Sequence, residues 1–234
     1  MSFSIPRPKS NTNLMNKKLF TSYLCDEDDF ILQEILNKWK TLNPDYEVLY
    51  FSDSDVEEFF KDTPQYKTYS KMRNGVAIAD FFRICYINKF GGYWFDLDVQ
   101  PISLKLPESG NIQLFDAGFG NISYMFIGGN PNQKLFNEVI EIVERNINDN
   151  IPIKKGHVID ITGPRVIQNI ICGLFNVVNQ DGWLIGDEHP RVGFEGGEYE
   201  FVYTKVPFPK LKTERYEKLQ QKYKRENYQV YNYI

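Results

Sequence analysis

The first sixty residues alternate between the apolar spacing of strands and that of helices. Residues favouring β structure at 18–24 and 46–51 predict two strands. After the acidic segment 26–29, apolar residues recur at helical spacing, namely Ile31, Leu32, Ile35, Leu36 and Trp39. The sequence Ser-Asp-Ser-Asp at 52–55 then predicts a capped short helix through Phe60. This β-α-β-α order predicts the beginning of a nucleotide-binding α/β sheet.

The segment 79–99 is the centre around which the chain is organised, and its first half predicts a helix. Four apolar residues follow the i, i+3, i+4, i+7 spacing of a buried face: Ile78, Phe81, Phe82 and Cys85. Asp80 and Arg83 are three residues apart, so we expect them to be neighbours on the helix surface, roughly opposite that face.

The second half of this segment predicts a strand that carries two carboxylates. The pair Gly91-Gly92 suits the end of the helix, because glycine adopts positive φ at little cost. Residues 93–95 favour an extended strand, and alternate side chains of a strand share a face, so Asp96 and Asp98 are expected to project together. Such a pair is costly unless a cation or hydrogen-bond donors satisfy it. Oxygen ligands of this kind predict a site for Mg²⁺ or Mn²⁺.

The remainder of the chain adds further strands and helices. Strands are predicted at 112–115 and 122–127, followed by a helix that begins at Asn130-Pro131. The apolar face of that helix is predicted to be Leu135, Phe136, Val139, Ile140 and Val143. Thr162, in the sequence Thr-Gly-Pro at 162–164, is expected to cap the next helix, although a substrate contact is an alternative role. The basic, tyrosine-rich segment 210–234 predicts a solvated terminal helix or tail.

Composition restricts the classes of function. The chain has 234 residues, enough for one α/β domain, and its formal net charge of −4 argues against a general nucleic-acid binder. The odd number of cysteines, 3, suits reduced thiols and predicts a cytoplasmic location. We expect no transmembrane segment, since no apolar run has the length of a membrane span. We also expect no signal peptide, because the N-terminal residues lack its apolar centre.

The order Asp-x-x-Arg and then Gly-Gly-x-x-x-Asp-x-Asp, at residues 80–98, resembles the DXD family of sugar transferases. That family, glycosyltransferase family 32-like, contains yeast α-mannosyltransferases and bacterial capsular-polysaccharide transferases, and the catalytic domains of large clostridial glucosylating toxins are more distantly similar. The resemblance implies a single GT-A-type domain, an α/β fold with a Rossmann-like mixed sheet flanked by helices. It also implies a retaining, metal-dependent transferase that takes a UDP-sugar or GDP-mannose as donor and a glycan or other hydroxyl group as acceptor.

The resemblance assigns roles to individual residues. Asp98 corresponds to the direct metal ligand, and Asp96 would contact the ribose, the sugar or the metal's water shell. Asp80 and Arg83 correspond to the pair that holds the hydroxyl groups of the donor sugar, and Gly92 lies in the nucleotide-sugar-binding motif. Arg83, Asp96 and Asp98 would therefore be the catalytic residues.

Two further expectations concern the ends of the chain. In related transferases a late histidine completes the metal shell, which makes His189 an additional candidate ligand, with an ordinary exposed loop histidine as the alternative. We predict an extended arm at 1–16, a GT-A domain at 17–209 and the tail at 210–234.

Two other functions fit parts of the pattern. An apolar strand that ends in Asp-x-Asp also occurs in phosphohydrolases of the haloacid-dehalogenase type. Those enzymes place it on the first strand, and such a function would leave Asp80 and Arg83 unexplained. The other alternative is a sugar-nucleotide-binding relative that has lost catalysis.

Overall fold

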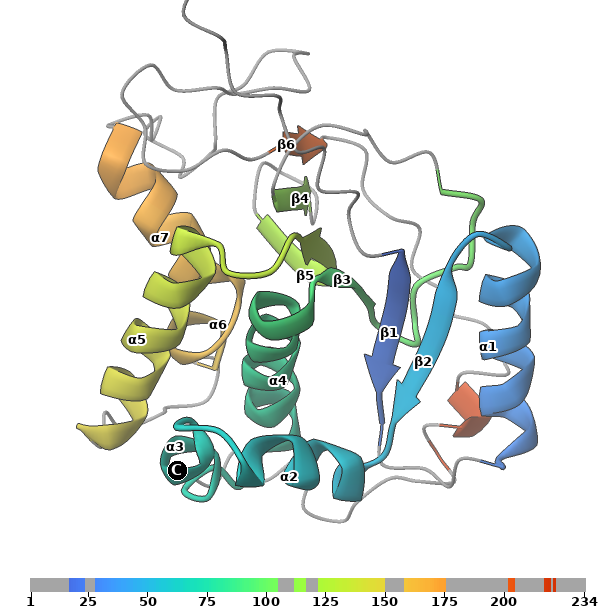
Figure 1. Ribbon diagram of the computed structural model, residues 1–234, viewed down its shortest axis with the longest axis horizontal. Coiled ribbons are helices and arrows are strands. Elements are labelled where there is room, and N and C mark those ends of the chain that lie inside the picture. The colour runs from blue at the N-terminus through green and yellow to red at the C-terminus, as the bar shows by residue number, and fades with distance from the viewer. Residues whose placement is uncertain are drawn as a thin grey trace, which may run out of the picture.

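Strand β1 (Lys18–Ser22) lies between two parallel neighbours, β2 (Glu47–Phe51) and β3 (Gly92–Phe95), and the three strands therefore end at the same side of the sheet. The computed structural model describes residues 17–23, 28–104, 112–116, 122–149, 158–175, 202–204, 217–219 and 221. Within these residues six strands form one mixed sheet in the order β2-β1-β3-β5-β4-β6. All pairings are parallel except those of β5, which runs antiparallel to both β3 and β4. The carboxyl ends of β1, β2 and β3 therefore share one edge of the sheet (Figure 1).

The helices and strands follow one another along the chain in the order shown in Figure 1. Their bounds are β1 Lys18–Ser22, α1 Phe30–Leu42, β2 Glu47–Phe51, α2 Asp53–Lys61, α3 Tyr66–Tyr69, α4 Gly75–Phe90, β3 Gly92–Phe95, β4 Ile112–Asp116, β5 Ile122–Gly129, α5 Lys134–Asn148, α6 Val158–Ile161, α7 Pro164–Phe175 and β6 Val202–Thr204.

The sheet separates two apolar clusters. Successive residues of a strand point to opposite faces, so Leu19 joins one cluster and Phe20 the other, as do Tyr93 and Trp94. Helix α1 contributes to the cluster of Leu19 and Tyr93, whereas α2, α4, α5, α6 and α7 contribute to the cluster of Phe20 and Trp94. The predicted α/β fold, a mixed sheet flanked by helices, is confirmed.

The local signals at the start of the chain predicted the first helices correctly. Asp29 caps α1 by accepting hydrogen bonds from the backbone N–H groups of Ile31 and Leu32. Ser52 and Asp55 form a capping box at the start of α2.

The predicted start of helix α5, at Asn130-Pro131, is wrong, because α5 begins at Lys134. The segment before it is held by α4 instead. The backbone N–H of Asn132 donates to the Asn88 carbonyl oxygen at 2.7 Å, and that of Gln133 donates to Asn88 Oδ1 at 3.0 Å. These tertiary hydrogen bonds compete with a helical conformation and delay the helix by one turn.

The segment 210–234 is described only at 217–219 and 221, which are helical, and Glu217, Lys218 and Gln221 are exposed as in the predicted solvated helix, with one exception. Leu219 is fully buried in the cluster of α1, with Leu32 and Trp39. The predicted arm at 1–16 lies outside the described residues, and the domain boundaries stay a prediction. In the described part of the chain, no helix is long and apolar enough to cross a membrane.

Gly128 tests how tightly the centre of the sheet is packed. It pairs with Tyr93 across β3 and β5, and a Cβ at Gly128 would lie 2.1 Å from the Tyr93 ring. We expect Gly128→Ala to lower the free energy of unfolding, measured with urea, by about 1–3 kcal/mol or more. In a Tyr93→Leu background, which removes the ring, the same substitution should cost much less. Equal losses in the two backgrounds would show that this contact does not limit packing.

Candidate functional site

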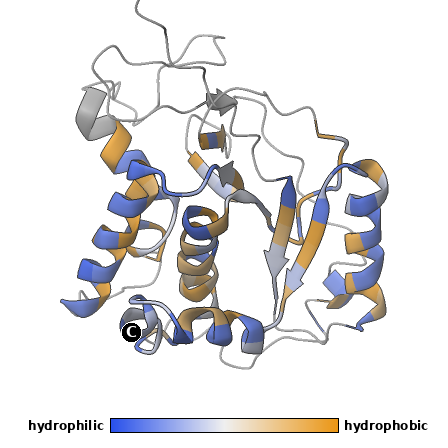
Figure 2. Cartoon of the chain, in the orientation of Figure 1, coloured by the Kyte–Doolittle hydropathy of each residue, from blue (hydrophilic) through white to orange (hydrophobic). Residues whose placement is uncertain are grey.

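Helix α4 carries the Asp80 and Arg83 side chains into the interior. Asn74 caps it by accepting from the backbone N–H groups of Val76 and Ala77, and Gly91, with φ +71°, ends it. Between these caps every residue from 80 to 87 is buried, and the side of the helix seen in Figure 2 is mostly apolar. The expectation that Asp80 and Arg83 lie on an exposed surface is therefore wrong: each is only 5% exposed.

Arg83 has partners on three elements. Its Nε donates to the Ala79 carbonyl oxygen at 3.1 Å, and one terminal nitrogen donates to the Tyr124 carbonyl oxygen of β5 at 2.6 Å. The guanidinium lies 3.3 Å from a carboxylate oxygen of Asp80 and 3.3 Å from one of Asp96. It also stacks over the Trp94 ring, 4.3 Å from the ring centroid. A buried arginine is tolerated only with such compensation.

Asp80 lies on the inner side of Arg83, against the junction of α6 and α7. The Thr162 hydroxyl is 3.5 Å from Asp80 Oδ2 and 3.2 Å from the Val158 carbonyl oxygen, two acceptors that compete for one proton. The prediction that Thr162 caps α7 is thus wrong, since its side chain faces α4 and α6. A Cβ on Gly163 would come within 3.2 Å of Asp80 Oδ2, so this glycine permits the close approach.

Burial raises the pKa of Asp80 to about 7. Desolvation of the carboxylate outweighs the Arg83 charge and the Thr162 hydrogen bond, and the charge of Asp96 acts in the same direction as burial. Near neutral pH the group therefore changes between a carboxylate paired with Arg83 and a carboxylic acid. The acid can donate to Thr162, which leaves the hydroxyl proton of Thr162 for Val158.

Asp96 and Asp98 lie on a turn beyond the end of a strand. Strand β3 ends at Phe95, and the backbone N–H of Val99 donates to the Asp96 carbonyl oxygen at 2.9 Å. The prediction that both carboxylates project from one face of a continuing strand is therefore wrong. β5 anchors the turn, because the Asp96 N–H donates to the Met125 carbonyl oxygen at 2.8 Å. One oxygen of Asp98 is removed from solvent, whereas the Asp96 side chain is 31% exposed.

This turn lines a pocket of about 150 Å³ at the carboxyl ends of β1 and β3. Its lining comprises Ser22, Tyr23, Val76, Ala79, Arg83, Trp94, Asp96, Leu97 and Asp98. Ser22, Tyr23 and Ala79 also line a second pocket, so the two adjoin. In open α/β sheets the usual place for a ligand is beyond the carboxyl ends of the strands, where neighbouring connections diverge.

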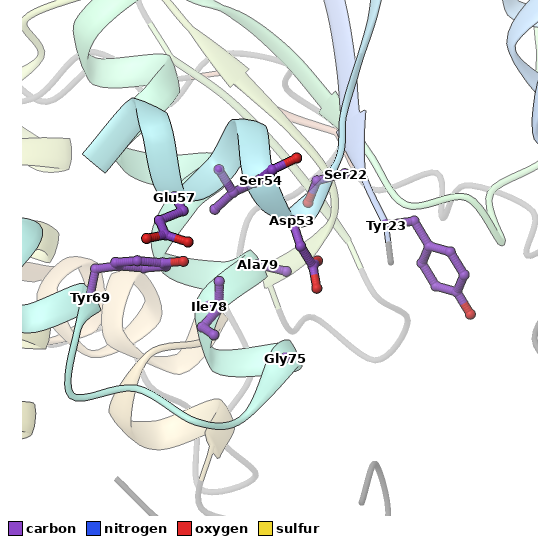
Figure 3. A pocket seen from close by; sticks show the side chains of 10 residues that line it. Ser22, Tyr23, Asp53, Ser54, Glu57, Tyr69, Gly75, Ile78 and Ala79 are labelled. Carbon is purple, nitrogen blue, oxygen red and sulfur yellow. The ribbon is translucent and has the colours of Figure 1, made fainter. Parts of the chain in front are cut away.

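The second pocket is larger, about 370 Å³, and lies between α2 and the first turns of α4 (Figure 3). Asp53 and Glu57 project from α2, Tyr23 follows β1, and Tyr69 ends α3. Burial raises the pKa of Tyr69, and the charges of Glu57 and then Asp53 raise it further. The described residues that line this larger pocket supply carboxylates, hydroxyl groups and aromatic rings but no lysine or arginine.

The residues of the turn fit a hard divalent cation. Asp96 and Asp98 offer carboxylate oxygens, which Mg²⁺ and Mn²⁺ prefer, and Mg²⁺ is commonly held by one or two carboxylates with phosphate oxygens completing its shell. Among the described residues no group of three or more His, Cys, Asp or Glu side chains could hold a metal alone. His189 lies outside the described residues.

The structure brings most of the predicted site residues together. Arg83, Asp96 and Asp98 line one pocket, whereas Asp80 supports Arg83 from the side that faces Thr162. Gly92 lies at the opposite end of β3, packed against Lys18, where an added Cβ would meet the Lys18 backbone oxygen at 3.0 Å.

Sequence reasoning missed three contributors: Trp94, Tyr124 and Ser22. The available signal for Trp94 was its position two residues before Asp96, because residues i and i+2 of a strand share a face. No local signal marks Tyr124, whose carbonyl oxygen reaches Arg83 across 41 residues of chain.

Two comparisons with known proteins gave matches, one to a segment of the sequence and one to the fold. Residues 30–111 match the family model described as a glycosyltransferase sugar-binding region containing a DXD motif. The matched segment is about a third of the chain. It extends from the start of α1 to the residue before β4 and includes Asp80, Arg83, Asp96 and Asp98. No curated protein matches the chain significantly.

A solved structure, that of the PaToxG glycosyltransferase, is similar with a TM-score of 0.51 at 13% sequence identity. The likeness covers 72% of each chain and at this identity concerns the fold alone. The predicted resemblance to DXD glycosyltransferases is confirmed for the sequence segment 30–111 and for the fold. Its narrower form, the mannosyltransferase and capsular-polysaccharide type, stays a prediction.

The buried Asp80 predicts a particular dependence of stability on pH. The pKa of Asp80 is about 7 in the folded chain against its ordinary value of 3.8, so the folded state binds the proton more tightly. The stability this proton supplies is fully present below pH 3.8 and is lost as the pH rises through 7. As the pH rises between these two values, the titration of Asp80 alone lowers the free energy of unfolding by up to about 1.4 kcal/mol per pH unit.

Asp80→Asn should therefore flatten the decline in stability measured by urea unfolding from pH 5 to pH 8. Asp62→Asn replaces an exposed carboxylate at the end of α2 and should keep the wild-type slope. Parallel curves for Asp80→Asn and wild type would contradict the assignment.

Proposed function

We propose that the protein transfers a sugar from a nucleotide-diphosphate donor, a UDP-sugar or GDP-mannose, to a hydroxyl group of a glycan or another acceptor. The observation that carries this proposal is the Asp96–Asp98 turn beside Arg83, at the carboxyl end of β3, within the matched sugar-binding region. The resemblance of the motif to the retaining family implies retention of anomeric configuration.

The two adjoining pockets suit different parts of such a donor. The pocket of 370 Å³ is within the usual range for small-molecule sites, about 300–1,000 Å³. Its carboxylates and hydroxyl groups can accept hydrogen bonds from the N–H groups of a base and the O–H groups of a ribose, and its tyrosine rings can pack against the base. A described lining without lysine or arginine suits a diphosphate poorly. We therefore assign the nucleoside to this pocket and the diphosphate-sugar to the neighbouring one.

Asp96 and Asp98 are the residues that would hold Mn²⁺ or Mg²⁺. When bound, the ion supplies Lewis-acid stabilisation of the charge that develops on the departing diphosphate. Arg83 places a permanent positive charge beside Asp96, which orients the turn and lowers repulsion between neighbouring carboxylates. Ser22 and Tyr23 close the pocket from the end of β1.

The phosphohydrolase alternative fits the structure less well. The Asp-x-Asp sequence follows β3, which is the third strand among the described residues and pairs with the first, β1. The non-catalytic alternative, a sugar-nucleotide binder, is separated from a transferase by measuring turnover.

The direct test is a thermal-shift panel of UDP-sugars and GDP-mannose, each with manganese and with a chelator, followed by detection of donor hydrolysis or transfer. A ligand that binds the native state raises the unfolding midpoint by mass action. A shift that requires manganese, together with turnover, supports the transferase, whereas a shift without turnover supports the binder. A protein that responds to no nucleotide sugar would overturn the proposal.

Asp98→Asn provides a sharper test. The substitution is nearly isosteric and removes one negative charge from the turn, so the unfolding midpoint of the metal-free protein should stay the same or rise slightly. Manganese-linked nucleotide binding should be lost, and turnover should fall several hundred-fold or more, which corresponds to about 3–4 kcal/mol of transition-state stabilisation. Asp149→Asn, at an exposed site just beyond α5, is the matched control and should keep wild-type turnover. An Asp98→Asn protein that unfolds but retains activity per folded molecule would make Asp98 a structural residue.

A further inference from the structure

Trp94 connects the two charged groups of the turn. Its indole Nε1 donates to Asp96 Oδ1 at 2.6 Å, a short distance typical of a charge-assisted hydrogen bond. The face of the same ring supports the Arg83 guanidinium, 4.3 Å from the ring centroid. Trp94 is only 2% exposed yet lines the pocket of the turn. One rigid side chain therefore fixes an anion through its edge and a cation through its face.

One hydrogen bond and one ion pair reach Asp96, and both involve the same carboxylate oxygen. Arg83 approaches Asp96 Oδ1 at 3.3 Å, and the Trp94 indole donates to the same atom. Within the described residues both contacts involve Oδ1, which leaves Oδ2 for a ligand. A carboxylate held in this way has little freedom to rotate, and groups that hold a metal-binding carboxylate in place also tune its affinity for the metal.

We propose that Trp94 is a positioning residue, which orients the Asp96 carboxylate so that Asp96 meets a divalent cation or the donor through Oδ2 alone. The part that concerns the cation rests on the proposed function. The hydrogen bond itself is independent of it. Phenylalanine at position 94 would keep a ring face beneath Arg83 and lose the N–H donor, so the two contributions of the side chain can be separated.

The first experiment measures Mn²⁺ affinity by calorimetry, with UDP or GDP present, for wild type and Trp94→Phe. Loss of a partner that orients a metal ligand typically weakens metal binding about 10–100-fold, and we expect a loss in this range. The matched control is Trp39→Phe. Trp39 is fully buried on the other face of the sheet, and its Nε1 has no hydrogen-bond partner among the described residues. Trp39→Phe should therefore leave Mn²⁺ affinity within about twofold of wild type, even where it lowers the unfolding midpoint.

The second experiment observes the hydrogen bond directly in the metal-free protein labelled with ¹⁵N-tryptophan. The Trp94 indole resonance is assigned by its absence from Trp94→Phe. It should lie downfield of the Trp39 resonance and should move upfield in Asp96→Ala, whereas the Trp39 resonance should stay in place. A Trp94 resonance that is unaffected by Asp96→Ala would overturn the proposal whatever the metal does.

The outcomes separate this proposal from the proposed function. If wild type binds Mn²⁺ with nucleotide and Trp94→Phe binds it equally well, Trp94 is a core residue only, and the transferase proposal survives. If wild type binds no Mn²⁺ with either nucleotide, the metal-dependent function fails, and the role of Trp94 toward a cation fails with it. A weakened affinity in Trp94→Phe alone, together with the Asp96-dependent resonance, supports both.

Discussion

The burial of the Arg83 guanidinium is the constraint on which the site depends. A charge removed from water is tolerated only when nearly all of its donors are satisfied, and leaving such a group unpaired costs about 3–5 kcal/mol. The partners come from the helix itself, from the β5 backbone at Tyr124 and from the turn at Asp96. These elements must keep their relative positions for the chain to fold. The same interactions therefore stabilise the core and hold the pocket in shape.

The carboxylates near Arg83 outnumber its single positive charge, so the site carries an excess of negative charge that attracts cations. The carboxylates of Asp80 and Asp96 each lie 3.3 Å from this guanidinium, and that of Asp98 lines the same pocket as Arg83. A proton on Asp80, whose pKa burial raises to about 7, removes part of the excess negative charge. The remainder lies on the turn, at the side that opens to the pocket. In the proposed function, a divalent ion held there would balance this remaining charge.

The sequence was informative wherever structure depends on neighbours in the chain. The caps at Asp29 and Ser52 and the termination at Gly91 all depend on contacts within a few residues. Prediction failed where distant segments decide the outcome. Helical spacing assigned Asp80 and Arg83 to a polar surface, but partners 82 and 41 residues away, at Thr162 and Tyr124, allow them to be buried.

At the end of β3, the alternation of side chains along a strand gives one wrong prediction and one right one. Period-two alternation was applied to Asp96 and Asp98, yet the strand ends at Phe95 and the rule no longer holds beyond it. Applied two residues earlier in the chain, the same alternation places Trp94 and Asp96 on one face, and the structure joins these two side chains by a hydrogen bond. The end of the strand thus has a consequence for function. It leaves Asp96 joined to the rigid sheet through Trp94, while Asp98 lies on the turn with one carboxylate oxygen removed from solvent. Both carboxylates nevertheless line one pocket, so the backbone of the turn, and not the alternation of a strand, brings them to the same space.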